Sequence, residues 1–167
     1  TRELDPYAYT MHLDGAPLLD GYTPGTLSDW LQRSHRVLST VCGWLDHPQK
    51  LCIENVEGWD PEVFAPLMDD LPVSRVVDVG HLWLQDVDPL EHLDRWLERT
   101  RVVHLHGIAA RDHSSLAGVE PSVLDPVVSS LARGFSGVLT LEVFALDDFT
   151  SSLEALAASL RRLGGEA

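Results

Sequence analysis

An apolar run that carries an acidic or histidine side chain at its end occurs five times along this sequence of 167 residues. The best-defined copy is the stretch from Arg75 to His81, RVVDVGH, in which valines flank Asp78. The other four copies are YAYTMH ending at His12, LCIEN carrying Glu54, RVVHLHG carrying His104 and His106, and VLTLEVF carrying Glu142. Runs that are apolar on both faces are typical of buried parallel strands. The sequence therefore favours folds that bury a parallel sheet.

Helical patterns separate these runs. Thr26 is the expected N-cap of the first helix, Pro61 the first residue of the second, and Gly134 the left-handed cap that ends the fourth. The predicted strands are Tyr7–Leu13, Leu51–Val56, Ser74–Val79, Arg101–Leu105 and Val138–Phe144. The predicted helices are Leu27–Trp44, Pro61–Leu71, one that begins at Pro89, Pro121–Arg133 and Leu153–Leu163.

Strands that alternate with helices, without hairpin signals between them, predict an α/β fold with a parallel sheet covered by helices. The intervals from Glu54 to Asp78 and from Asp78 to His104 each fit one βα unit. A chain of this length is long enough to bury one core and too short for two domains of ordinary size. We therefore expect residues 1–167 to form a single domain.

Charge and composition exclude some classes of function. The formal net charge of −14 argues against binding to nucleic acid, because neutralising a phosphate backbone needs clustered Lys and Arg. No apolar stretch approaches the roughly 20 residues that a membrane span requires. The two cysteines, Cys42 and Cys52, suggest neither a zinc site nor a disulfide framework. We expect a cytoplasmic protein that acts on a small molecule.

Acidic and histidine side chains gather at the predicted strand ends. Parallel α/β folds place their sites at the carboxyl ends of the strands. Carboxylate and imidazole groups suit Mn, Zn, Fe or Co, and a mixed set can hold more than one ion. The sequence therefore predicts a divalent-metal site with six candidate ligands: His12, Glu54, Asp78, His81, His104 and Glu142.

Other polar residues receive different interpretations. Asp112 and His113 lie in the loop that leaves the fourth strand, where they would face the same site. Strand alternation turns His106 to the face of His104, but the strand can end before it, so either orientation is open. Asn55 is interpreted as a structural residue or as one that supports a ligand. The histidines on helices or helix ends are interpreted as structural: His35, His47 and His92.

Several of these segments resemble the xylose-isomerase-like TIM-barrel superfamily, which includes sugar isomerases and epimerases and the apurinic endonucleases of the endonuclease-four type. The segments are ENV at Glu54, DVGH at Asp78, HLHG at His104, DH at Asp112 and LEVF at Leu141. Within this superfamily, HLHG, RDHSSL and VLTLEVF look most like the cobamide-remodelling phosphodiesterases. The resemblance implies that the six candidates match divalent-metal ligands, and that Asp112 and His113 match a further acidic–histidine pair.

The chain departs from this pattern in two ways. The endonuclease pattern has one residue between the Asp and His that are adjacent here as Asp112 and His113. A complete barrel of this type has about 250 residues, and only five βα units are recognisable here. We expect the C-terminal five units of a (β/α)8 TIM barrel, with the first three units missing. The open edge of such a partial barrel would allow self-association.

These observations lead to three functional hypotheses. The favoured one is divalent-metal-dependent phosphodiester hydrolysis of a small molecule, with a corrinoid as the candidate substrate and with Asp112 or His113 orienting it or moving a proton. The alternative is a metal-dependent sugar isomerase or epimerase, in which Glu54 and Glu142 exchange a proton with the substrate. The third is an inactive truncated barrel that serves as a binding module.

Overall fold

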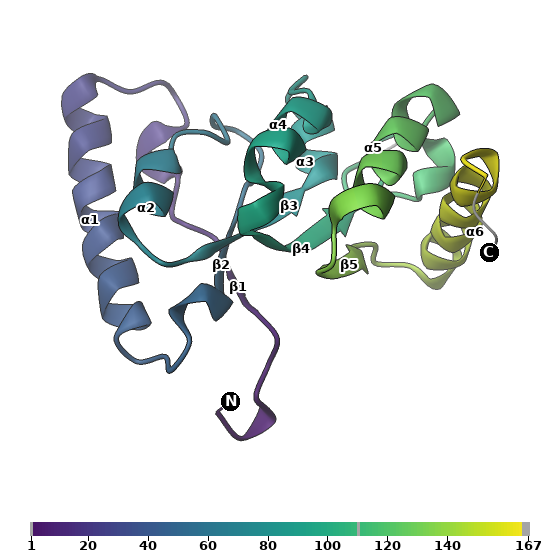
Figure 1. Ribbon diagram of the computed structural model, residues 1–167. Coiled ribbons are helices and arrows are strands. Elements are labelled where there is room, and N and C mark those ends of the chain that lie inside the picture. Colours follow the sequence, from purple (N-terminus) through teal and green to yellow (C-terminus); the bar gives the residue numbers. More distant parts are fainter. Residues whose placement is uncertain (1, 110, 165–167) are drawn as a thin grey trace.

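The computed structural model describes residues 2–109 and 111–164, and in this part of the chain one parallel sheet forms the centre of the fold. The strands are β1 (Tyr9–Met11), β2 (Leu51–Glu54), β3 (Ser74–Asp78), β4 (Thr100–Leu105) and β5 (Val138–Leu141), and they lie in the order β1-β2-β3-β4-β5. Every neighbouring pair is parallel. Figure 1 shows the strands in one curved row with helices around them. The predicted parallel α/β arrangement is confirmed.

Helices connect successive strands. The α-helices are α1 (Pro24–Cys42), α2 (Ala65–Asp70), α3 (Val79–Leu84), α4 (Pro89–Trp96), α5 (Pro121–Gly134) and α6 (Leu146–Arg162). Short 3-10 helices lie at η1 (Arg2–Leu4), η2 (Ala16–Leu18), η3 (Pro48–Lys50), η4 (Leu97–Arg99) and η5 (Leu116–Gly118). None of the helices in the described residues combines the length and the apolar character needed to cross a membrane.

Two helices begin earlier than predicted. Helix α1 starts at Pro24, and its N-cap is Thr23, whose side chain accepts a hydrogen bond from the backbone N–H of Thr26 at 3.1 Å. Proline is tolerated in the first turn, because its missing N–H would have no intrahelical partner there. Helix α6 starts at Leu146 instead of Leu153, since its first turns are too exposed to show an apolar stripe.

Two other helix boundaries also differ from the prediction. Helix α2 begins only at Ala65, because the residues after Pro61 form turns. Gly134 is the last residue of α5 and does not take a left-handed conformation. Phe135 follows it with an extended backbone, φ −93° and ψ 126°, which leads the chain directly toward β5. The predicted left-handed cap at Gly134 is therefore wrong.

A short helix that the sequence reading missed follows β3 directly. Strand β3 ends at Asp78, and α3 begins at Val79, where the end of a strand and a loop were predicted. The carboxylate of Asp78 caps α3 by accepting a hydrogen bond from the backbone N–H of His81 at 2.8 Å. An aspartate at an N-cap satisfies a free amide of the first turn. Asp78 therefore joins the end of the strand to the start of the helix.

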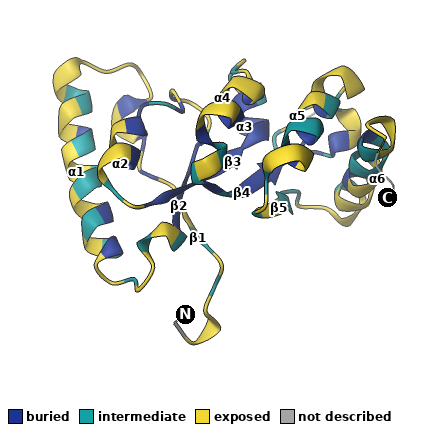
Figure 2. Ribbon diagram, in the orientation of Figure 1, coloured by how far each residue is buried: buried dark blue, intermediate teal, exposed yellow. Residues whose placement is uncertain are grey.

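The two faces of the sheet are packed differently. Large apolar clusters fill the space between the strands and the helices, and Figure 2 shows buried residues on β2, β3 and β4 and on the sides of the helices that face them. The inner face carries a small apolar layer made of Cys52, Val76 and Val102. Because side chains alternate along a strand, the residues two positions later lie on the same inner face. These residues are Glu54, Asp78 and His104.

Candidate metal centre

Four side chains from four segments meet at the carboxyl end of the sheet. Glu54 ends β2, Asp78 ends β3, His104 lies near the end of β4, and Glu142 follows β5 directly. Each offers one nitrogen or oxygen atom, and these atoms all lie within 4.8 Å of one another. The structure thus brings together four of the six predicted metal ligands in one compact group, which we call the four-ligand group.

His104 lies at the centre of this group. Its Nδ1 is 3.2 Å from Oε1 of Glu54 and 3.6 Å from Oδ2 of Asp78, and it also contacts Oε2 of Glu142. Glu54 and Asp78 are 2% and 0% exposed, so both carboxylates are shielded from water. One imidazole nitrogen therefore faces three carboxylates, two of them buried.

The charges in the four-ligand group depend on one another. Burial alone lowers the pKa of His104, but contacts with Asp78, Glu142 and Glu54 outweigh burial and raise the pKa to about 11. Burial alone raises the pKa of Asp78, but hydrogen bonds with His104 and His106 outweigh it and hold the pKa well below its usual range. The hydrogen bond with His104 also lowers the pKa of Glu142. Asp78 and Glu142 are therefore ionised at neutral pH, and the space among them favours a cation.

The four-ligand group fits a divalent metal ion. Oδ2 of Asp78 and Oε2 of Glu142 are buried, and within the described residues both face the same atom, Nδ1 of His104. Buried ionised oxygens are costly unless a cation compensates them, and one imidazole serves three carboxylates here. Metal–ligand bonds of about 2.0–2.3 Å would allow one ion to reach all four atoms. Mixed carboxylate and imidazole donors suit Mn, Fe, Co or Zn.

Asn55 holds the backbone of the site in register. Its Nδ2 donates to the backbone oxygen of Asp78 at 2.9 Å, and its Oδ1 accepts from the backbone N–H of Asp78 at 2.9 Å. The side chain is buried, and these two bonds join the end of β2 to the end of β3. The amide therefore fixes the place from which the Asp78 carboxylate projects. The ENV motif marked this residue, but only the fold shows its partner.

His81 lies beside the four-ligand group. Its Nδ1 donates to the backbone oxygen of Asn55 at 3.1 Å. Nε2 is buried and makes no hydrogen bond within the described residues, although Oε2 of Glu57 and Oδ2 of Asp112 lie 3.3 and 3.6 Å away. His81 thus directs a ring nitrogen toward two carboxylates. Sequence reasoning did not single out Glu57, which no apolar run marks.

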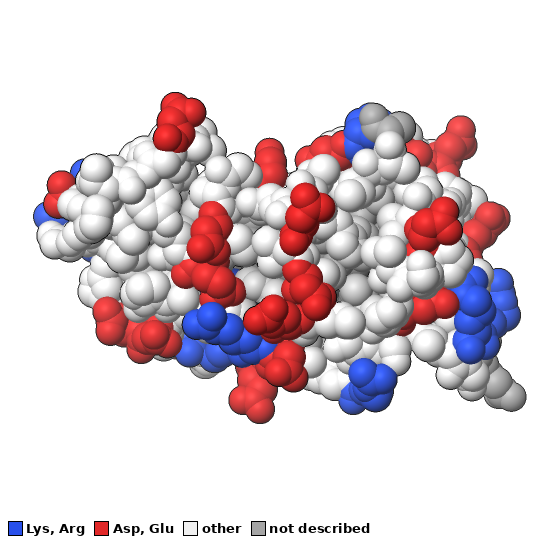
Figure 3. Space-filling model, turned by 90° about the horizontal axis from the view of Figure 1, so that it is seen from above, with Lys and Arg blue, Asp and Glu red and all other residues white. Residues whose placement is uncertain are grey.

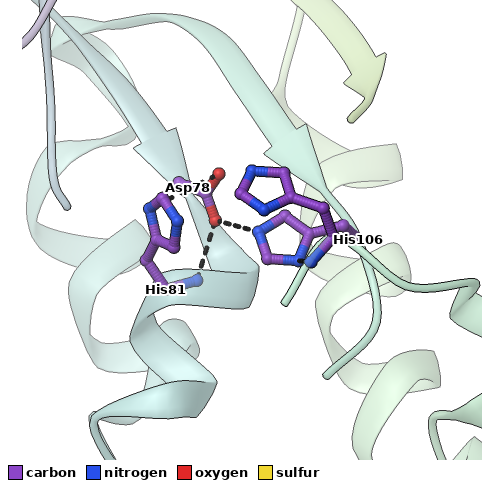
Figure 4. Close-up of side chains that lie close together, drawn as sticks. Asp78, His81 and His106 are labelled. Carbon is purple, nitrogen blue, oxygen red and sulfur yellow. Dashed lines mark hydrogen bonds and ion pairs between the residues drawn. The ribbon is translucent and has the colours of Figure 1, made fainter. Parts of the chain in front are cut away.

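Two further sets of side chains have ligand atoms close enough to share an ion. One consists of Asp78, His81, His106 and His113, and the other consists of Glu57, His81 and Asp112. Figure 4 shows Asp78 between His81 and His106, with interactions to both. Nε2 of His106 lies 3.0 Å from Oδ1 of Asp78. His106, whose orientation the sequence left open, therefore points into the site.

Three other residues predicted from the sequence lie at the border of the site: His12, Asp112 and His113. Nε2 of His12 is 3.1 Å from Oε2 of Glu54, but the His12 side chain is 58% exposed and lies outside the three clusters of candidate ligands. Nδ1 of His113 is 2.8 Å from Oδ2 of Asp112, and this pair adjoins His81 and His106. His113 has a left-handed backbone with φ 54°, a conformation that is uncommon outside glycine, although histidine adopts it more often than most residues.

One helix histidine belongs to a separate polar network. His92 is buried on α4, where Nδ1 is 2.9 Å from Oε1 of Glu62 and Nε2 is 2.9 Å from the guanidinium of Arg75. The Arg75 guanidinium stacks on the rings of Phe64 and Trp96. This network therefore connects β3 with the helices that cover it. His92 lies outside the three clusters of candidate ligands.

The surface carries an excess of negative charge. Figure 3 shows acidic side chains across the face seen from above and smaller groups of Lys and Arg among them. This distribution agrees with the net charge of −14. Such a surface repels polyanions through its long-range field.

Comparison with known proteins identifies the fold. Neither a protein-family model nor a curated protein matches this sequence. A solved D-tagatose 3-epimerase-like protein superposes with a TM-score of 0.77 at 22% identity, and the match covers 97% of this chain and 65% of that one. The apo 3-keto-D-glucoside 4-epimerase of E. coli gives a TM-score of 0.60 at 14% identity, over 86% of this chain and 58% of that one. The fold is a partial TIM barrel like that of these two solved structures. The chain spans less than two thirds of the length of either solved structure.

These similarities correct the favoured functional hypothesis. Both of these solved structures are described as sugar epimerases or epimerase-like proteins, so the prediction of phosphodiester hydrolysis is wrong. The narrower resemblance to cobamide-remodelling phosphodiesterases loses its support, and with it the corrinoid as substrate. Short motifs such as HLHG indicate a type of barrel and the residue types at the ends of its strands, but enzymes with different reactions share them. The single domain, the cytoplasmic location, the small-molecule substrate and self-association stay predictions.

Proposed function

We propose that the protein is a metal-dependent sugar isomerase or epimerase. The observation that carries this proposal is the convergence of Glu54, Asp78, His104 and Glu142 at the carboxyl end of the sheet. The similarity in fold to a D-tagatose 3-epimerase-like protein supports it. Fold alone does not determine function, so the argument rests on the chemistry of these side chains.

The four-ligand group would hold one divalent ion, either Mn, Fe, Co or Zn. When bound, such an ion supplies a Lewis acid that polarises a carbonyl or hydroxyl oxygen of a sugar. The protein would contribute three carboxylates and one imidazole in fixed positions. Asn55 would maintain those positions by holding the backbone at Asp78.

Glu54 and Glu142 are the two groups suited to proton transfer. Each carboxylate has two oxygens, so one can hold the ion while the other accepts or donates a proton. The two glutamates come from β2 and from the end of β5, on opposite sides of His104 in the strand order. One, ionised, would remove the proton from the carbon next to a carbonyl, and the other, protonated beforehand, would deliver a different proton to the opposite face. That exchange inverts the carbon.

The side chains bordering the four-ligand group would orient the sugar. Nε2 of His81 makes no hydrogen bond within the described residues and would be available to a sugar hydroxyl, and Asp112 and His113 lie next to it. The ring of Phe144 stacks on His113 with centroids 4.8 Å apart and is 74% exposed. An exposed aromatic ring beside polar side chains would cover the apolar face of a sugar.

Solvent exchange tests the proposal directly. The full chain would be incubated in deuterated water with D-tagatose, D-fructose or a 3-keto-D-glucoside, with Mn²⁺ or Co²⁺ added, and followed by NMR. We expect deuterium at a carbon next to the carbonyl and the appearance of an epimer or isomer. A chelator should abolish both. Glu142→Gln should reduce turnover by at least about 100-fold, as expected for the loss of an acid–base group.

One control variant and one further active-site variant accompany Glu142→Gln. Glu91→Gln is the control, because it removes an exposed carboxylate from the first turn of α4. This variant should catalyse deuterium exchange into the sugar at the wild-type rate. Glu54→Gln should behave like Glu142→Gln, because both glutamates take part in the transfer. If no sugar in the panel exchanges with either metal, the proposed reaction is wrong.

A further inference from the structure

His106 is not a member of the four-ligand group, but it contacts one member, Asp78. Its side chain is fully buried, and its Nε2 is 3.0 Å from Oδ1 of Asp78. Oδ1 of Asp78 also accepts the backbone N–H of His81 at 2.8 Å. Both hydrogen bonds go to the same carboxylate oxygen, so Oδ2 is left to face His104. Figure 4 shows this arrangement, with His81 and His106 on either side of Asp78.

The ring of His106 is held on its other sides as well. Its Nδ1 lies 3.2 Å from the backbone oxygen of Gly107 and 3.3 Å from the backbone nitrogen of His113. Because an ionised carboxylate only accepts, Nε2 is the donor in the hydrogen bond with Asp78. The ring stacks on that of His113 with centroids 4.3 Å apart and planes 12° from parallel. It meets the ring of His81 edge-on at 5.3 Å. The imidazole therefore has one orientation, and that orientation points at Asp78.

Gly80 provides the space in which this ring lies. A Cβ atom at Gly80 would overlap Cε1, Nε2 and Nδ1 of His106. Gly80 lies within α3, where glycine weakens a helix relative to alanine. Its backbone is not in the left-handed region, so the chain conformation does not require glycine there. The close approach of the His106 ring is the feature that requires it.

We propose that His106 is a positioning residue that orients Asp78 toward the metal, with Gly80 as its steric counterpart. The proposal rests on the metal site of the proposed function. Hydrogen bonds behind a ligand set its orientation, and their loss commonly weakens metal binding about 10- to 100-fold. Without the bond from His106, the Asp78 carboxylate can rotate and turn Oδ2 away from the other three ligands.

An alternative role for His106 is direct ligation of a second ion with Asp78, His81 and His113, whose ligand atoms also lie close together. The contacts favour positioning over ligation. Both ring nitrogens of His106 already have partners, and the ring is sealed between Gly80 and His113. The two roles differ in stoichiometry, because positioning needs one ion per chain and ligation needs two.

Cobalt binding to the full chain distinguishes these roles. Metal-free protein would be titrated with Co²⁺, with visible absorption reporting both affinity and ligand geometry. We expect one ion per chain in the wild type. His106→Ala should bind that ion 10- to 100-fold more weakly with an altered spectrum, while His106→Gln should restore binding, since its amide N–H can reach Oδ1 of Asp78. The exposed His47→Gln is the matched control and should bind as the wild type does.

A double-mutant cycle tests the role of Gly80. Gly80→Ala should weaken Co²⁺ binding in the wild type by displacing the His106 ring. In the His106→Ala background the same change should have little further effect, because the ring that it would strike is absent. Additive losses would overturn the coupling of Gly80 to His106. Circular dichroism and thermal unfolding of each variant would show whether the protein is folded.

The remaining outcomes separate this inference from the proposed reaction. If the wild type bound two Co²⁺ ions and His106→Ala bound one, His106 would be a metal ligand, and the positioning role would be overturned. Wild-type affinity and spectrum in folded His106→Ala would also overturn it. If cobalt binding behaved as expected but no sugar took up deuterium, only the proposed isomerase or epimerase reaction would be contradicted. A wild type that binds no cobalt would overturn both.

Discussion

Nδ1 of His104 lies 3.2 Å from Oε1 of Glu54, although 50 positions separate the two residues and β3 lies between their strands. Strands in a sheet are about 4.8 Å apart, so the backbones of β2 and β4 are about 10 Å from each other. The sheet curves, as Figure 1 shows. The two side chains meet because both project from the inner face of this curve, where Nδ1 of His104 also lies 3.6 Å from Oδ2 of Asp78. Curvature of the barrel wall is thus what turns separate strand ends into one site.

Metal affinity should rise with pH. In the metal-free protein the carboxylates raise the pKa of His104 to about 11, so the imidazole carries a proton that a metal ion must displace. The competition from protons weakens as pH increases. We expect binding of Co²⁺ or Mn²⁺ to tighten about tenfold per pH unit between pH 6 and 8, since one proton is released. Isothermal titration calorimetry at three pH values would measure this, and an affinity independent of pH would contradict it.

Removal of the Asn55 amide should destabilise the fold. Asn55→Ala leaves the buried N–H and C=O of Asp78 without partners, and each unsatisfied group costs about 1–3 kcal/mol. We therefore expect a loss of about 2–4 kcal/mol in the free energy of unfolding, measured by urea denaturation. Gln49→Ala removes an exposed amide close in sequence and should change stability by less than about 0.5 kcal/mol. Equal effects of the two substitutions would exclude the role given to Asn55.

His92 should make the protein less stable in mild acid. Burial, followed by the charges of Arg75 and Arg95, lowers its pKa to about 3. A lowered pKa means that the unfolded chain binds a proton that the folded protein does not, so stability is complete above the ordinary pKa near 6.5 and decreases as pH falls toward 3. The slope is about 1.4 kcal/mol per pH unit. Between pH 6.5 and 5 we expect a loss of about 2 kcal/mol from this residue.

Comparison with His92→Gln isolates that effect. Glutamine has no titrating group, whereas His104 and His106, with raised pKa values, act equally in both proteins. Urea denaturation at pH 7 and pH 5 should show the stability of the wild type decreasing relative to the variant. A difference that stays constant across this range would show that His92 is protonated in the folded protein.

Gly15 should be intolerant of a side chain for steric reasons. A Cβ atom there would overlap the indole ring of Trp59, which is buried and packed edge-on against Trp30. Gly15→Ala should destabilise the fold by about 1–3 kcal/mol, the usual cost of overpacking. Gly25→Ala is the matched control, because the nearest atom to its Cβ is 3.7 Å away. Thermal unfolding should show a lower midpoint for the first variant only.

Much of the fold follows from local patterns in the sequence. The valines around Asp78 predict a buried strand, and the structure has β3 from Ser74 to Asp78. The pattern is less informative at helix ends. Thr26 was predicted as the cap of α1 because it lies next to the apolar stripe, which begins at Leu27. The true cap is Thr23, since the first turn of the helix, which begins at Pro24, precedes that stripe. Helix α3 was missed because a run of six residues, VGHLWL, is too short to show a helical period.

Part of the site was predictable for the same reason. A side chain two positions beyond an inward-facing residue also faces inward, so Glu54, Asp78 and His104 could be grouped from strand patterns alone. His12 fits the same pattern, but its side chain is 58% exposed. It follows the edge strand β1, where the described residues place no further strand to cover it. Alternation predicts the direction of a side chain and does not predict how far it is enclosed.

The sequence by itself determined the strands, their parallel order and the residue types at their ends, because hydrophobic periodicity and residue spacing are local properties. Only the tertiary structure decided the partners. It turned Asp78 into a helix cap whose Oδ1 is held by His81 and His106, and it left Oδ2 facing His104. It also fitted the His106 ring into the space beside Gly80. Such contacts depend on the curvature of the sheet and on distances between residues far apart in the chain, which no local pattern records.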